Sequence, residues 1–186
     1  TRPQLWVRKR IFDKLRDIQL EKPCSVLHVR RTDVALEPKQ IHKRHYFPLS
    51  DYLVKSTTPN ILLLTDDQSA INEIQDYNDT QYNWTYIRRK RFTGTEGGML
   101  GFFPSGNVVG EMIIILAEMK LATRCRTLVH TRSGFAKLLQ QEMKLAQYPA
   151  SVTNFRIDAG RQPNNTYYIT PEQFFAKLEK DRKKKN

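Results

Sequence analysis

Short apolar segments alternate with helix-like segments along this chain, and this alternation constrains the fold most. The run at 60–65, Asn-Ile-Leu-Leu-Leu-Thr, is continuously apolar at its centre, which is typical of a strand covered on both faces. Strands are expected at 24–29, 60–65, 84–87, 127–131 and 152–157, and helices at 5–19, 47–55, 68–77, 108–123 and 135–146, with a closing helix near residue 170. This order predicts one α/β domain over 1–186, built on a doubly wound, Rossmann-like parallel sheet.

Polar residues follow three of these strands directly. They are His28, Arg30, Arg31 and Asp33 in the first case, Asp66 and Asp67 in the second, and Thr131 to Gly134 in the third. The carboxyl ends of parallel strands meet at one edge of a sheet, where ligands bind. Arginine forks and helix N-termini both favour phosphate. We therefore expect a single anion site at this edge, suited to a nucleotide or a nucleotide sugar.

The predicted helix at 108–123 is apolar nearly all round, which is typical of a central helix. Glu111 and Glu118 lie seven residues apart, near one face. A glutamate on a buried helix is either paired or functional. The segment before this helix, 88–106, contains five glycines and is expected to be a long loop; it lacks the Gly-Lys-Ser/Thr of a Walker loop.

The formal net charge of +12 favours anionic partners. Basic residues gather at 8–10, 43–44 and 88–91 and in a basic tail at 176–186. A non-catalytic α/β module that binds RNA or another polyanion is therefore one hypothesis. Nucleic acid is not favoured, because aromatic residues are not interleaved with these clusters. No apolar run reaches the roughly 18 residues of a membrane span.

The two cysteines and four histidines predict neither a disulfide framework nor a metal site. Cys24 and Cys125 lie at or beside predicted strands and are expected to be buried thiols. His28, His42, His45 and His130 show no spacing typical of a metal site.

Together these segments resemble a known family. The run His28 to Asp33 (His-Val-Arg-Arg-Thr-Asp), the segment Thr65-Asp66-Asp67, a long helix and the run Leu128 to Phe135 are similar in order and spacing to the nucleotide-binding half of the α1,6-fucosyltransferase group. The resemblance covers about residues 24–145. It implies the C-terminal, donor-binding half of a GT-B glycosyltransferase, with the acceptor-side half expected N-terminal to residue 1. It also implies GDP-fucose as donor, a glycan hydroxyl as acceptor, inversion, no metal or other cofactor, and a Golgi or secretory lumen location.

Position by position, the resemblance implies a role for each residue of the motifs. Arg30 would hold the donor diphosphate, with Arg31 beside it and Asp33 closing the motif. The remaining donor contacts would be His28 and Glu118 at the guanine, Ser133, Gly134 and Phe135 around the diphosphate, Asp66 and Asp67 at the cleft, and Tyr52. Glu37 is the candidate general base, although it lies one residue closer to Asp33 than the family pattern has it. Val34 also departs from the pattern, because a basic residue is expected there.

Two further alternatives stay open at this point. Few side chains of a GT-B transferase contact the donor sugar, so a GT-B transferase that uses a different nucleotide sugar also fits these motifs. The glycosylation patterns that begin at Asn78, Asn83 and Asn164 are compatible with a secretory lumen, but such tripeptides are common, and a cytoplasmic location also remains open.

Overall fold

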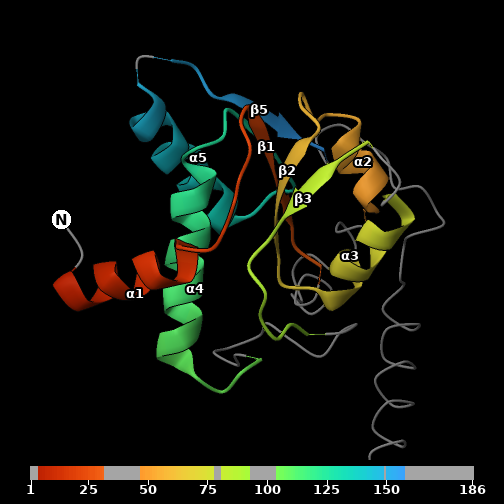
Figure 1. The fold of residues 1–186 in the computed structure, drawn as a ribbon. Helices are drawn as coiled ribbons and strands as arrows, with labels where there is room; N and C mark the ends of the chain where they lie inside the picture. The colour runs from red at the N-terminus through yellow and green to blue at the C-terminus, as the bar shows by residue number, and fades with distance from the viewer. Residues whose placement is uncertain (1–3, 32–46, 78–80, 93–103, 149, 158–186) are drawn as a thin grey trace, which may run out of the picture.

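The computed structural model describes residues 4–31, 47–77, 81–92, 104–148 and 150–157 (Figure 1). Its centre is a five-stranded sheet in the order β3-β2-β1-β4-β5, and every pair of neighbouring strands is parallel. The strands are β1 (Cys24–Val29), β2 (Asn60–Thr65), β3 (Asn83–Thr85), β4 (Thr127–His130) and β5 (Thr153–Arg156). The predicted α/β fold with a parallel sheet is confirmed.

Helices cover both faces of the sheet. They are α1 (Leu5–Leu15), α2 (Leu49–Leu53), α3 (Gln68–Asn72) with the short 3-10 helix η2 (Glu73–Tyr77), α4 (Val108–Ala122) and α5 (Gly134–Gln147). Figure 1 shows α4 and α5 on one side of the sheet, with α1 lying across α4, and α2 and α3 on the other side. The closing helix expected near residue 170 lies outside the described residues. No helix in the described ranges is long and apolar enough to cross a membrane.

Successive residues of the central strands enter two different hydrophobic cores. Val26 and Leu62 pack with α4 and α5, whereas Leu27, Ile61 and Leu63 pack on the α2 and α3 side. This alternation explains why the run at 60–65 is apolar without a polar face. If the same alternation continues past the end of a strand, it predicts whether each following polar residue lies on the α4 and α5 side of the sheet or on the α2 and α3 side.

The first helix differs from its prediction. It ends at Leu15 rather than at residue 19, and Leu15 is its one buried residue in the structure. Phe12, one helical turn before Leu15, has 65% of its surface exposed. The helical period predicts which residues share a face, but it cannot tell how much of that face another element covers.

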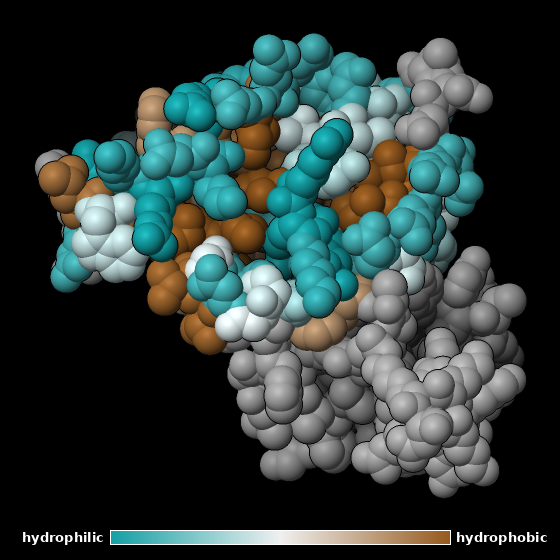
Figure 2. Space-filling model, turned by 60° about the horizontal axis from the view of Figure 1, so that its bottom comes forward, coloured by the Kyte–Doolittle hydropathy of each residue, from teal (hydrophilic) through white to brown (hydrophobic). Residues whose placement is uncertain are grey.

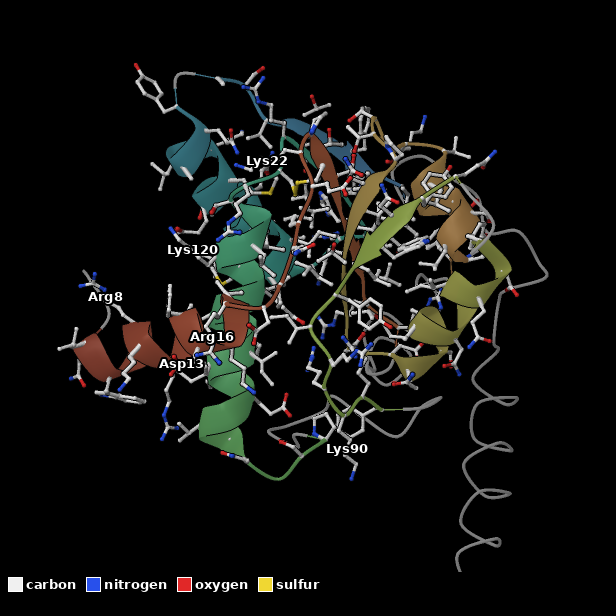
Figure 3. The ribbon with its side chains drawn as sticks, viewed as in Figure 1. Arg8, Asp13, Arg16, Lys22, Lys90 and Lys120 are labelled. Atoms are coloured by element: carbon white, nitrogen blue, oxygen red, sulfur yellow. A yellow bond between two sulfur atoms is a disulfide. The ribbon has the colours of Figure 1, made fainter. Side chains whose placement is uncertain are left out.

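The two cysteines form a disulfide, so their prediction as buried thiols was wrong (Figure 3). Cys24 is the first residue of β1, and Cys125 lies in the turn between α4 and β4. The two strands are neighbours, with Ser25 opposite Thr127, which brings the cysteine Cα atoms to 4.8 Å. A sequence separation of 101 residues gave no indication of this pairing.

Candidate functional site at the strand ends

The candidate site lies at the carboxyl ends of the neighbouring strands β1 and β4, where the segments that leave the two strands run to opposite sides of the sheet. The chain leaves β1 toward α2 and leaves β4 toward α5, and His28 and His130 are register partners at the ends of the two strands. In a doubly wound sheet, ligands bind at this switch point. Figure 2 turns the lower end of Figure 1 forward, and hydrophilic residues run across that face between hydrophobic areas.

His28 is a neutral, buried histidine at this switch point. Only 6% of its surface is exposed, and its ring centroid lies 5.2 Å from that of Phe135 on α5. Burial lowers the pKa of His28 to about 3, with repulsion from His130 and Arg30 acting in the same direction. Within the described part of the chain, its Nδ1 has no hydrogen-bond partner. His28 therefore offers an uncharged ring with one nitrogen left for a ligand.

Glu118 lies on α4, on the same side of the sheet, and is also buried. Burial raises the pKa of Glu118 to about 7, although Arg89 and Arg91 act against this rise. Its Oε1 lies 3.4 Å from Nε of Arg89. Neither of these two atoms has a hydrogen-bond partner among the described residues. Glu118 therefore has a buried carboxylate oxygen that is available for a hydrogen bond, and the positive charges of Arg89 and Arg91 partly offset its negative charge.

Arg89, which no motif in the sequence distinguishes from its basic neighbours, connects α4 to β2. Its guanidinium donates from Nη1 to Glu111 Oε2 at 3.1 Å and from Nη2 to the Thr65 carbonyl at 3.1 Å. Arg91 also donates to the Thr65 carbonyl, at 3.1 Å, and burial lowers its pKa. The four basic residues at 88–91 do not act as one cluster, because Arg89 and Arg91 donate hydrogen bonds within the protein whereas Arg88 and Lys90 are exposed.

The first turn of α5 is the candidate phosphate site. The Ser133 hydroxyl is already used, because it caps the helix by accepting a hydrogen bond from the Ala136 N–H at 2.9 Å. The first N–H groups of a helix have no partner within the helix, and they carry partial positive charge. A Cβ added at Gly134 would meet nothing within 4 Å, so the space beside this residue is open.

Arg31 lies on the other side of the sheet from His28. It forms an ion pair with Glu73, Nη1 to Oε1 at 2.6 Å, and donates from Nη2 to the Phe47 carbonyl at 2.6 Å. Its Nη1 also lies 3.6 Å from Oδ2 of Asp67, whose other oxygen caps α3 by accepting from the Ser69 N–H. These contacts hold Arg31, just beyond β1, against both ends of α3, where Asp67 precedes the helix and Glu73 begins η2. A donor contact for Arg31 or Asp67 stays a prediction.

The other predicted site residues divide between the two sides and the undescribed segments. Tyr52 is 1% exposed within the core on the α2 and α3 side. Asp66 accepts a hydrogen bond from the Arg31 N–H at 3.2 Å. Arg30 is two residues after His28, so the strand alternation places it on the same side of the sheet, and its charge helps to lower the pKa of His28. Asp33 and Glu37 lie outside the described residues.

The structure places one set of the predicted residues on the α4 and α5 side of the strand ends, where His28 contacts Phe135 and lies near Arg30, while Glu118 contacts Arg89. This set, called the strand-end site below, consists of His28, Arg30, Glu118 and Ser133 to Phe135. Arg89 joins it through Glu118.

No protein-family model and no curated protein matches this chain. Among solved structures, NodZ α-1,6-fucosyltransferase soaked with GDP-fucose is similar to 75% of this chain, at 15% identity and a TM-score of 0.42. Fucosyltransferase NodZ from Bradyrhizobium is similar to 77% of it, at 14% identity and a TM-score of 0.42. The chain spans 42% of the length of each of these structures.

Proposed function

We propose that this chain is the donor-binding half of an inverting, metal-independent glycosyltransferase that moves fucose from GDP-fucose to a hydroxyl of a glycan. One observation carries the proposal. His28 and Glu118 are buried on the same side of the strand ends, and each leaves a polar atom without a hydrogen-bond partner among the described residues, although Glu118 Oε1 is ion-paired with Arg89. Buried polar atoms in native proteins almost always have hydrogen-bond partners. A bound base would provide them.

Guanine fits these two side chains better than adenine does. Its Watson–Crick edge carries two adjacent donors, the ring N1–H and the exocyclic amine, and an ionised Glu118 accepts from both. The neutral ring of His28 has one N–H, which suits the O6 or N7 acceptor of guanine. Adenine places an acceptor where guanine has its ring N–H, and that acceptor would face the carboxylate.

The diphosphate would lie between Arg30 and the first turn of α5. As the bond between the fucose anomeric carbon and the β-phosphate oxygen breaks, negative charge grows on GDP. The Arg30 guanidinium and the N–H groups of Gly134 and Phe135 would stabilise that charge. The acceptor oxygen bonds to the anomeric carbon from the opposite face, and we assign the removal of its proton to Glu37.

The disulfide supports a secretory or Golgi lumen as the compartment. Cys24 and Cys125 are bonded within the core, and structural disulfides persist in oxidising compartments. The run at 88–91 gives less support to polyanion binding, because Arg89 and Arg91 make internal hydrogen bonds and only Arg88 and Lys90 are exposed.

The proposal is tested by incubating the protein with GDP-fucose in the presence of EDTA. The expected result is slow release of GDP and of free fucose, whose anomeric configuration, read by NMR, is inverted relative to the donor. GDP-mannose and ADP-glucose serve as controls and should release nothing at the same concentration. A protein that neither binds nor hydrolyses GDP-fucose would contradict the proposal.

The variant Glu118→Gln is expected to bind GDP about tenfold or more weakly, because a good bidentate base contact contributes about 1–3 kcal/mol. Since the pKa of Glu118 is raised to about 7, wild-type affinity should fall as the pH drops below about 7 and the carboxylate is protonated. The variant should lose this pH dependence. Calorimetric titration across that range measures both effects. Glu142→Gln on α5 is the matched control, and a wild-type affinity that is independent of pH would exclude Glu118 as the base contact.

A further inference from the structure

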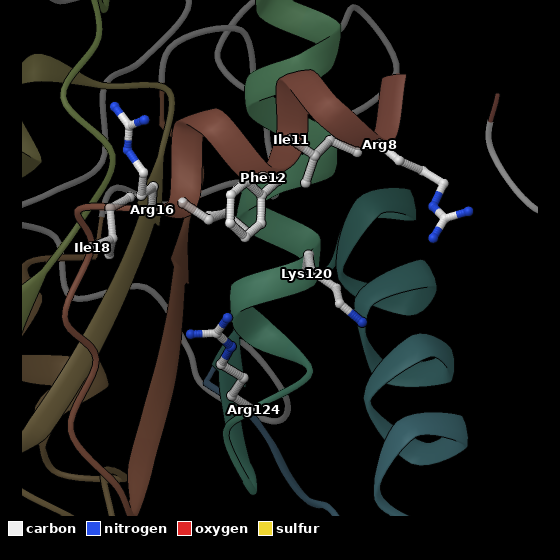
Figure 4. Close-up of a pocket in the computed structure, with 8 residues that line it drawn as sticks. Arg8, Ile11, Phe12, Arg16, Ile18, Lys120 and Arg124 are labelled. Atoms are coloured by element: carbon white, nitrogen blue, oxygen red, sulfur yellow. The ribbon is translucent and has the colours of Figure 1, made fainter. Parts of the chain in front are cut away.

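A cavity lies between α1 and the C-terminal end of α4, and we call it the α1–α4 groove (Figure 4). Its volume is about 720 Å³. Arg124, which lines it, follows α4 and immediately precedes Cys125, whose disulfide partner is the first residue of β1. The groove therefore lies toward the amino ends of the strands, away from the strand-end site.

The floor of the groove is apolar. It is formed by Ile11, Phe12 and Leu15 of α1 and by Ile18 beyond the helix. Leu15 is buried and Ile11 and Ile18 pack against the core, but Phe12 keeps 65% of its surface exposed. An aromatic ring left exposed in a concave site is typical of a position that a ligand covers.

The charged residues that line the groove are all cations. Arg8 and Arg16 lie on either side of Phe12 in Figure 4, and Lys120 and Arg124 lie along α4 below it. Arg16 has an exposed partner, Asp17, at 3.6 Å. Among the described residues, none forms an ion pair with Arg8, Lys120 or Arg124. An apolar floor with a positive rim is complementary to a ligand that is apolar at one end and anionic at the other.

We propose that the α1–α4 groove binds a small amphiphilic anion as a dissolved monomer. The apolar chain or ring of the ligand would cover Phe12 and the floor, and its phosphate, sulfate or carboxylate head would lie against Lys120 and Arg124. The volume is within the range of small-molecule sites, about 300–1,000 Å³. A concave site of this size can hold a single small molecule. This binding does not depend on the proposed transferase function.

Alkyl phosphates of increasing chain length, each below its micelle concentration, are the probes for this site. Calorimetry should show the affinity rising about fourfold for each added methylene, because burying a CH₂ contributes about 0.8 kcal/mol. Inorganic phosphate alone and an alkyltrimethylammonium of equal chain length should bind at least tenfold more weakly than the matching alkyl phosphate, because they lack the apolar body and the anionic head respectively.

Two variants test the placement of the ligand. The double variant K120E/R124E should lose at least tenfold in affinity for dodecyl phosphate. Its matched control is K9E/K22E, which changes the net charge equally at exposed residues outside the groove, and which should bind as wild type does. Phe12→Ser removes an exposed ring and should also lose at least tenfold without a change in the melting temperature.

Three results would overturn the proposal. Equal loss in both double variants would show that the charge effect is nonspecific. Equal binding of the alkyltrimethylammonium would show that the anionic head plays no part. Binding that requires vesicles of anionic phospholipid, with none to the dissolved monomer, would identify a membrane contact instead.

Discussion

Replacing Arg30 by alanine is expected to weaken the binding of GDP and GDP-fucose by about 100-fold or more. A hydrogen bond to a charged group contributes about 1.5–3 kcal/mol, and a guanidinium fork makes two of them to a diphosphate. Arg30 is suited to this contact because it lies beside His28, whose pKa it lowers, on the same side of the sheet as α5. Calorimetric titration of wild type and variant with GDP measures the loss.

Two further variants separate recognition of the diphosphate from a general effect of charge. Arg30→Lys keeps the charge but loses the fork, so its affinity should fall between those of wild type and Arg30→Ala. Arg88→Ala removes an exposed arginine and should bind GDP as wild type does. Wild-type affinity in Arg30→Ala, with an unchanged melting temperature, would show that Arg30 does not hold the diphosphate.

Replacing both Cys24 and Cys125 by alanine is expected to lower the free energy of unfolding by about 2–5 kcal/mol. The disulfide closes a loop with a sequence separation of 101 residues, so it strongly restricts the unfolded chain. For a chain of this length, the melting temperature should fall by about 5–15 °C. Thermal unfolding followed by circular dichroism measures this shift.

The double variant should also be insensitive to reductant, whereas wild type unfolded and refolded with reductant should melt near the temperature of the variant. Thiol titration of the unfolded, unreduced protein provides an independent check. Two reactive thiols per chain would contradict the disulfide.

The sheet could be predicted from sequence because its central strands are bounded by local signals. The prolines at 23 and 59 precede β1 and β2, and the structure places both strands at their predicted bounds. β3 was less well predicted: it spans Asn83–Thr85 rather than 84–87. An edge strand of three residues lacks the apolar run that identifies the central strands.

The candidate site was predicted only in part, because neighbouring arginines in a sequence can have different partners in space. Because strand residues alternate between the two sides of the sheet, Arg31 contacts Glu73, which is 42 residues away in the sequence. Arg30 lies on the opposite side, near His28. The contact between Arg89 and Glu118 depends in the same way on how α4 packs against β2. Periodicity predicts which side of an element a residue occupies, whereas its partners depend on the tertiary packing.

The most direct test of the proposed function is a calorimetric comparison of GDP with ADP on the wild-type chain, with EDTA present and at a pH above the pKa of Glu118. If His28 and Glu118 contact the base, GDP should bind at least about 30-fold more tightly than ADP, from a discrimination of about 1–3 kcal/mol at each contact. Equal affinity for the two nucleotides, or no binding of either, would contradict the assignment of the strand-end site to a GDP-sugar.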